Sequence, residues 1–310
     1  MKKLFLLTLA ALSLQLGAQD LAHYKKIVKE LSSAKYQGRG YAEDGANKAG
    51  KWIAEEFEKV GADEVTCQPF KLDINTFPGK MKVSVDGKKL IPGQDFTLRE
   101  FNPGIKGEFK LCYVDTLNYN PDKIFADLAT PEYEGAFVVC DFMFTYKHSA
   151  DFRKLTSKKD CTNSGMVYTW EAPLKFYKAY GETVREKPII WVAPDFPTDA
   201  KTIKVDIENE FLKDYECFNV IAKVEGERHD SCYVFTAHYD HLGKLGKKTY
   251  YPGAHDNASG VAAVLDLAKY FSQNNPKYSV VFLFFCGEET GLIGSHYFTE
   301  NPLIPLKKIN

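Results

Sequence analysis

Hydrophobic positions recur at helical spacing in two stretches that follow residue 20. Apolar side chains from Leu21 to Leu31 return every three or four residues, which predicts an amphipathic helix. A second helix is predicted from about Ala46 to Val60, and Gly61 is well placed to end it. The loop Tyr36-Gln37-Gly38-Arg39-Gly40 lies between the two helices, and Val65 to Leu72 is predicted to be a strand.

The stretch from about Asn75 to Leu212 has a different pattern. Short β-like runs, Phe109 to Val114, Ala136 to Asp141 and Pro188 to Val192, are separated by turns rich in proline and glycine. His148 is its only histidine, and few of its side chains are plausible catalytic groups. This pattern predicts an inserted, β-rich accessory domain.

From Cys217 onward the pattern becomes α/β. Phe218 to Val224 and Cys232 to Ala237 are predicted strands, and Gly260 to Phe271 is a predicted amphipathic helix. The continuous apolar run from Val280 to Cys286 is typical of a strand that is buried on both faces. We therefore expect a sheet covered by helices, with polar sites in the loops that leave its strands.

The first nineteen residues are typical of an export signal. Lys2 and Lys3 precede an apolar run from Leu4 to Leu14, and small residues follow at Gly17 and Ala18. This run of about eleven residues is too short to span a bilayer, which needs roughly 20. An uncleaved anchor is the alternative. We expect a periplasmic or secreted protein with no membrane span after the signal is removed.

Composition and charge exclude some classes of protein. The 40 lysines and arginines nearly balance the 41 aspartates and glutamates, and no basic stripe occurs, so a nucleic-acid partner is not expected. The seven cysteines are odd in number and include no Cys-x-x-Cys pair. Neither a disulfide framework nor a metal site built from sulfur is therefore predicted.

Polar residues concentrate in three short segments, and the first directly follows a predicted strand. His238 and Asp240 are two residues apart, so in extended backbone both side chains point the same way. This arrangement suits an imidazole ligand whose orientation is held by a carboxylate. His241 would face the other side, where a plain loop histidine and a role with substrate are both open.

The other two segments supply carboxylates. Asp256 precedes a predicted helix, where it could bind a metal or simply cap the helix, and His255 beside it is not counted as a ligand. Glu288 and Glu289 follow the buried strand, where two adjacent carboxylates are costly unless a positive group is near. A metal would explain both, with one Glu as ligand and the other as the base that accepts a proton from water. A solvated loop is the alternative.

Together and in this order, the three segments resemble motifs of the co-catalytic zinc aminopeptidases of metallopeptidase family twenty-eight. Those motifs are His-x-Asp, Gly-x-x-Asp-Asn-x-Ser-Gly and Gly-Glu-Glu-x-Gly-x-x-Gly-Ser. The chain matches them at His238 and Asp240, at Gly253 to Gly260 and at Gly287 to Ser295. The resemblance implies a zinc exopeptidase-like α/β fold with a helix-covered, mixed and mainly parallel sheet, into which a protease-associated domain is inserted.

The resemblance also implies roles for individual residues. His238 would bind one Zn²⁺, Asp256 would bridge two, and Glu289 would bind the second. Glu288 would be the general base for hydrolysis by metal-activated water, Asp240 would orient His238, and the peptide bond after Asp256 would be cis. The implied substrates are peptides with a free N-terminus.

The resemblance implies further ligands that this chain lacks. The family needs an aspartate and a histidine later in the sequence, but the 21 residues after Glu289 contain no aspartate and only one histidine, His296. We therefore expect a C-terminally truncated chain that binds zinc poorly and has little activity. The expected divisions are an export signal (1–19), the start of the peptidase domain (20–74), a protease-associated-like insertion (75–212) and the truncated remainder of the peptidase domain (213–310).

Three other functions are compatible with the sequence. A glutaminyl-cyclase-like enzyme shares the fold, and a carboxypeptidase or dipeptidase shares the metal chemistry. Asp240 and the inserted segment favour the peptidase over the cyclase. A non-catalytic peptide- or protein-binding protein would use the β-rich middle as its working part. The presence of all four candidate site residues argues against this last alternative; they are His238, Asp256, Glu288 and Glu289.

Overall fold

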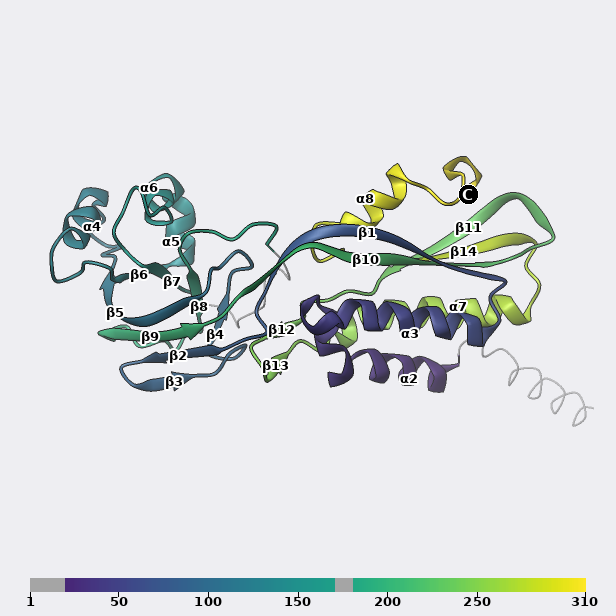
Figure 1. Ribbon diagram of the computed structural model, residues 1–310, viewed down its shortest axis with the longest axis horizontal. Coiled ribbons are helices and arrows are strands. Elements are labelled where there is room, and N and C mark those ends of the chain that lie inside the picture. Colours follow the sequence, from purple (N-terminus) through teal and green to yellow (C-terminus); the bar gives the residue numbers. More distant parts are fainter. Residues whose placement is uncertain (1–19, 171–180) are drawn as a thin grey trace, which may run out of the picture.

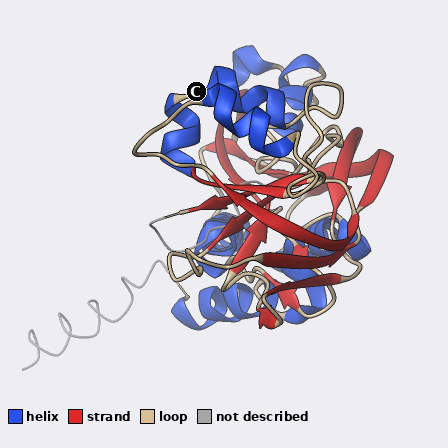
Figure 2. Ribbon diagram, turned by 90° about the vertical axis from the view of Figure 1, so that its left-hand side faces the viewer, coloured by secondary structure: helices blue, strands red, loops and turns tan. Residues whose placement is uncertain are grey.

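The computed structural model describes residues 20–170 and 181–310, so the predicted export signal lies outside the described residues. Two bodies lie side by side along the longest axis and are joined by two long strands, β1 (Glu64–Thr76) and β10 (Glu210–Val224) (Figure 1). Seen along that axis, strands occupy the middle of the molecule and helices lie outside them (Figure 2). No helix within the described ranges is long and apolar enough to cross a membrane.

The first body contains the predicted helices. α2 (Leu21–Leu31) begins after Asp20, whose carboxylate accepts from the backbone N–H groups of Ala22 and His23. α3 (Gly45–Val60) ends at Gly61, which adopts a left-handed φ of 88°. Together with α7 (Gly260–Gln273) they cover one face of a sheet, and α8 (Ile293–Glu300) lies on the other face (Figure 1). Helical turns lie at η1 (Ala34–Arg39), η2 (Ala42–Asp44), η3 (Ala254–Ser259) and η4 (Leu306–Lys308).

The sheet of this body is mixed and has the strand order β1-β10-β14-β11. β11 (Arg228–His238) and β14 (Tyr278–Phe285) are parallel, whereas β1 with β10 and β10 with β14 are antiparallel. The α/β class is thus confirmed, but parallel pairing does not dominate among the described strands. The reason is that β1 carries the chain out to the second body and β10 brings it back beside β1.

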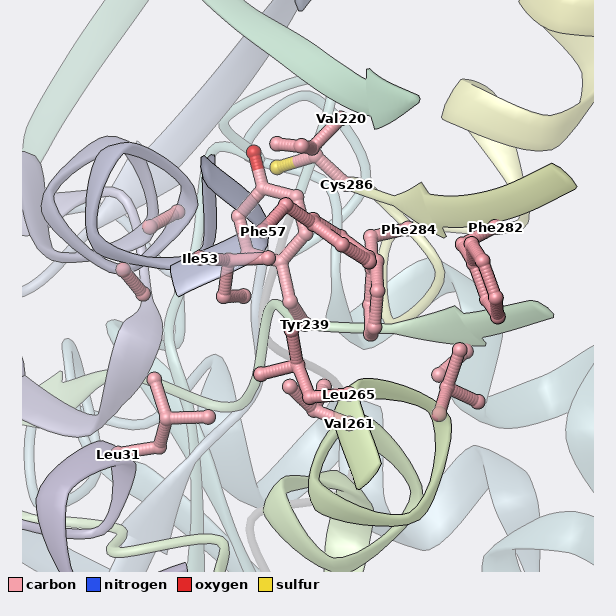
Figure 3. Packing of buried hydrophobic residues seen from close by; sticks show 14 of the residues in the cluster. Leu31, Ile53, Phe57, Val220, Tyr239, Val261, Leu265, Phe282, Phe284 and Cys286 are labelled. Atoms are coloured by element: carbon pink, nitrogen blue, oxygen red, sulfur yellow. The ribbon is translucent and has the colours of Figure 1, made fainter. Parts of the chain in front are cut away.

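The core of the first body lies between this sheet and its helices. Six of the eight residues of β14 are buried, which confirms the prediction of a strand covered on both faces. Phe57 of α3 packs against Phe284 of β14 with ring centroids 5.2 Å apart, and Leu265 of α7 lies in the same cluster (Figure 3). Aromatic packing of this kind fixes the helices on the sheet and so places the loops at its strand ends.

The second body is built on an eight-stranded sheet with the order β3-β2-β9-β5-β6-β7-β8-β4. The predicted β-like runs correspond to β5, β6 and β8. The strand bounds are β2 (Met81–Val85), β3 (Lys88–Leu90), β4 (Phe96–Leu98), β5 (Ile105–Tyr113), β6 (Phe137–Asp141), β7 (Gly165–Thr169), β8 (Ile189–Val192) and β9 (Thr202–Ile207). A two-stranded ribbon, β12 (Lys244–Leu245) with β13 (Thr249–Tyr250), lies between the bodies (Figure 1).

Three helices of the second body were not predicted. They are α4 (Pro121–Leu128), α5 (Phe142–Lys147) and α6 (Ser149–Leu155). The start of α4 could have been predicted from the sequence, because Asn120 is a favourable N-cap residue and Pro121 occupies the first turn. The second body is therefore richer in helix than expected, and its assignment as a protease-associated domain stays a prediction.

Candidate active site

The candidate site lies where β11 and β14 end. These parallel neighbours finish in register, with His238 opposite Phe285, so the loops that follow them start side by side. After β14, Gly287 adopts a left-handed φ of 81° and turns the chain into Glu288 and Glu289. The turn η3, which leads into α7, supplies Asp256.

His238 faces carboxylates with both of its ring nitrogens. Nε2 lies 3.1 Å from Oδ1 of Asp256 and 3.9 Å from Oε2 of Glu288. Nδ1 lies 3.7 Å from Oδ1 of Asp240, which is ion-pair rather than hydrogen-bond distance. Burial alone would lower the pKa of His238, but Asp240, Glu288 and Asp256 outweigh it and raise the pKa to about 9.

Asp240 ties the two strand-end loops together. Its carboxylate is fully buried and accepts from the backbone N–H groups of Glu288 and Glu289, at 3.1 and 3.2 Å. The hydroxyl of Tyr41 donates to it as well, at 3.2 Å. The sequence suggested only that Asp240 orients His238. The structure adds that Asp240 fixes the backbone of both glutamates, which no local sequence signal could reveal.

Glu288 has the environment of a proton acceptor. Burial raises its pKa, and the negative charges of Glu289, Asp240 and Asp256 add to this effect, whereas His238 opposes it. A carboxylate with a raised pKa accepts a proton at neutral pH more readily than an ordinary surface glutamate.

Glu289 pairs with a histidine that the sequence left undecided. Oε1 of Glu289 lies 2.8 Å from Nδ1 of His241, and His241 is buried. Together with Asp256 they form a group whose potential ligand atoms lie within 4.8 Å of one another. The expectation that His241 faces away was wrong, because β11 ends at His238 and the alternation of a strand no longer applies at His241, three residues later.

Asp256 occupies an extended segment rather than a helix cap. Its φ and ψ are −110° and 102°, and the peptide bond that joins it to Asn257 is cis, as the resemblance implied. The N–H of Gly260 donates a hydrogen bond to Oδ1 of Asn257, at 3.1 Å, so Asn257 rather than Asp256 caps the helix. The side chain of Asp256 is 61% exposed and free to meet a ligand. His255 is exposed and joins no cluster of potential ligands among the described residues.

The donor set fits zinc. Imidazole nitrogen and carboxylate oxygen are the usual ligands of catalytic zinc, and His238, Asp256, His241 and Glu289 present both kinds at one place. His296 does not take part, because it is exposed on α8 on the other face of the sheet (Figure 1). A cavity of about 720 Å³ lies on the second body between β2, β3, β5 and β9, and no histidine or cysteine lines it.

Comparison with known proteins places this site in a family. Residues 219–310 match the model described as Peptidase family M28. Over these residues, less than half of the chain, the sequence is similar to peptidase family M28. The matched segment includes β11, β14 and every candidate ligand named above.

Relatives of the M28 segment agree with this assignment. A probable zinc metalloprotease of Pyricularia oryzae is 38% identical over 85 residues, which are 26% of this chain and only 17% of that relative. The chain thus spans less than a fifth of that relative's length.

Two solved structures resemble the chain more widely. A Peptidase M28 precursor from Shewanella amazonensis has 18% identity and a TM-score of 0.67, covering 97% of this chain and 72% of its own. BSAP, a zinc aminopeptidase from Bacillus subtilis, has 17% identity and a TM-score of 0.64. The match covers 93% of this chain and 67% of the BSAP chain. At this level of identity the likeness shows the fold.

Proposed function

We propose that the protein containing this chain is a zinc-dependent aminopeptidase that removes N-terminal residues from peptides. The observation that carries the proposal is the convergence of His238, Asp256, Glu288 and Glu289 at two adjoining strand ends of the M28 segment. The solved structure of a zinc aminopeptidase with the same fold supports the choice of reaction. Export to the periplasm or beyond remains part of the proposal.

The ligands and the metal have distinct tasks in this proposal. His238 would hold one Zn²⁺ and Glu289 another, with Asp256 between them. Bound zinc lowers the pKa of water and acts as a Lewis acid toward a carbonyl oxygen. Asp240 holds the backbone of the loop that bears both glutamates, which keeps Glu288 and Glu289 in fixed positions.

Glu288 would move the proton. Its carboxylate accepts a proton from the attacking water and later delivers that proton to the leaving amine. Its raised pKa suits both halves of this task, because the group must be ionised to begin and readily protonated afterwards.

The test is zinc content and turnover, measured with amino-acid anilides. The 310-residue chain is compared with a form extended by the aspartate and histidine expected from the family. We expect the extended form to bind zinc. We also expect it to release aniline from anilides with a free amine but not from N-acetylated anilides. An extended form that binds no zinc, or cleaves no free-amine anilide, overturns the proposal. Ring closure of a peptide with N-terminal glutamine would instead identify a cyclase.

A further inference from the structure

Arg39 is a buried cation directly behind the candidate site. It lies in η1, in the loop between α2 and α3, and its side chain is 0% exposed although arginine is almost never fully buried. The loop was noted in the sequence without any function. Its place in the fold brings it against two segments that lie about 200 residues further along the chain.

The guanidinium group of Arg39 is fully used by main-chain acceptors. Its nitrogens donate at 2.8 to 3.2 Å to the carbonyl oxygens of Leu31, Tyr239, Pro252, Gly253 and Asp256. Three of these five carbonyls belong to the segment that carries Asp256, and one belongs to the segment that carries His238. A single side chain thus connects α2, the end of β11 and the loop before α7.

No carboxylate of the described residues forms an ion pair with Arg39, but three lie in its vicinity. The charges of Asp240, Asp256 and Glu289 all act on it favourably. Burying a cation is costly unless hydrogen bonds and opposite charge compensate for the lost water. Here both forms of compensation come from the candidate site itself, so Arg39 and the acidic cluster stabilise one another.

The main chain around Arg39 leaves no room for alternative packing. Arg39 itself has a φ of 49°, which is uncommon for a residue with a side chain. A Cβ atom on Gly40 would lie 2.4 Å from Cα of Gly243, and one on Gly253 would lie 2.6 Å from a guanidinium nitrogen of Arg39. The carbonyl of Arg39 also accepts from the N–H of His241, at 3.0 Å.

We propose that Arg39 is a positioning residue for the metal site, which holds the segment of residues 252–256 against the loop after β11 so that Asp256 meets His238 and Glu289. This inference rests on the proposed function for its reference to metal, but the positioning itself is a property of the metal-free chain. The planar fork of arginine is required, because lysine has only three donors, all on one nitrogen, and cannot satisfy the five carbonyl groups that Arg39 contacts.

The experiment compares four proteins, each in the extended form used to test the proposed function: wild type, Arg39→Lys, Ile53→Ala and Arg228→Met. Ile53 is a fully buried core residue of α3, so its variant controls for general loss of stability. Arg228 is an exposed arginine paired with Asp230, so its variant controls for the loss of one positive charge. Hydrogen–deuterium exchange is measured without metal, and zinc dissociation constants are measured by competition with a chromophoric chelator.

For Arg39→Lys we expect exchange in residues 252–258 to accelerate at least tenfold while α7 keeps its protection. The zinc dissociation constant should rise 10- to 100-fold, the range that follows loss of groups supporting metal ligands. Ile53→Ala and Arg228→Met should neither accelerate exchange in residues 252–258 more than in α7 nor change the zinc dissociation constant. If Arg39→Lys accelerates exchange no more in 252–258 than in α7, or leaves the zinc dissociation constant unchanged, the inference is wrong.

Two further outcomes keep this test separate from that of the proposed function. If the extended wild type binds no zinc, the proposed function fails, and the exchange measurement alone then decides whether Arg39 positions the segment. If Arg39→Lys does not fold, Gly40→Ala replaces it, since its Cβ would push the two loops apart without removing the charge. Unchanged exchange and zinc affinity in Gly40→Ala would also contradict the inference.

Discussion

The two bodies of this molecule are built from similar parts but use irregular backbone differently. Each has buried aromatic side chains on its strands and helices packed beside its sheet. In the first body, left-handed φ values occur at Gln37, Arg39 and Leu292, in loops that surround the candidate site. In the second body the one described non-glycine residue with such a value is Asp86, in the tight turn between β2 and β3.

Buried charge differs between the bodies in the same way. In the first body Arg39 and Asp240 are fully buried, and both hold loops that carry candidate ligands. In the second body the buried Lys187 donates to the carbonyl of Cys161 and to Asn163, which closes a structural network. Strained backbone and buried charge are costly, and in the first body they coincide with the only described group of potential metal ligands.

The strongest test of this contrast is a pair of matched glutamate substitutions. Glu288→Gln should reduce turnover of the extended form by about 10²–10⁴-fold, because it removes the proton acceptor. Glu108→Gln removes an exposed carboxylate of the second body, paired with Lys204, and should leave turnover unchanged. Turnover of amino-acid anilides and zinc content measure both. If the two substitutions reduced turnover equally, the functional difference drawn between the two bodies would be contradicted.

The next test asks whether the two cores are energetically separate. Phe284→Ala and Phe137→Ala each remove a fully buried ring and should cost about 3–5 kcal/mol of stability in their own body. Urea unfolding can resolve them, because Trp52 lies beside the first core, whereas Trp170 and Trp191 lie in the second body. Phe137→Ala should shift the unfolding midpoint of the second body and leave zinc affinity intact. A single common transition would show that the bodies unfold together.

The third test uses pH on the metal-free first body. The pKa of His238 is about 9 in the folded chain and about 6.5 when unperturbed, so its protonation stabilises the fold fully below pH 6.5. That stability, at most about 3 kcal/mol at 1.36 kcal/mol per pKa unit, is lost as pH rises from 6.5 through 9. Urea midpoints followed by Trp52 fluorescence should fall across this window.

His238→Gln provides the control for the pH test, because it removes the titrating group and should flatten the dependence. With zinc bound, the urea midpoint should instead rise with pH, since the metal competes with the proton for His238 and binds more tightly as pH rises toward 9. Midpoints of the metal-free wild type that stay level from pH 6.5 to 9 would contradict the charge arrangement around His238.

Much of the first body could be predicted from the sequence, because its signals are local. Both N-terminal helices, β14 and α7 follow from apolar periodicity and from a glycine at the end of α3. The clustering of the two polar segments that follow β11 and β14 was also predictable, since parallel neighbouring strands finish at one edge.

What could not be predicted depends on contacts between distant segments. The direction of His241 follows from where β11 ends, and that end is set by the neighbouring strand and loops rather than by local sequence. The burial of Arg39 depends on carbonyls about 200 residues away. The antiparallel majority of the sheet arises because the chain leaves through β1 and returns through β10.

The smallest expected effect concerns a helix cap in the second body. Oδ1 of Asn120 accepts from the N–H of Asp122 at the start of α4, 3.0 Å away, and this hydrogen bond satisfies a donor that the helix leaves unpaired. Asn120→Ala should therefore cost about 1 kcal/mol, whereas Asn120→Asp should restore most of it. Urea unfolding followed by Trp170 and Trp191 should detect the shift, with no change in zinc affinity. A change in zinc affinity would mean that the second body acts on the site, and the separation drawn between the two bodies would no longer hold.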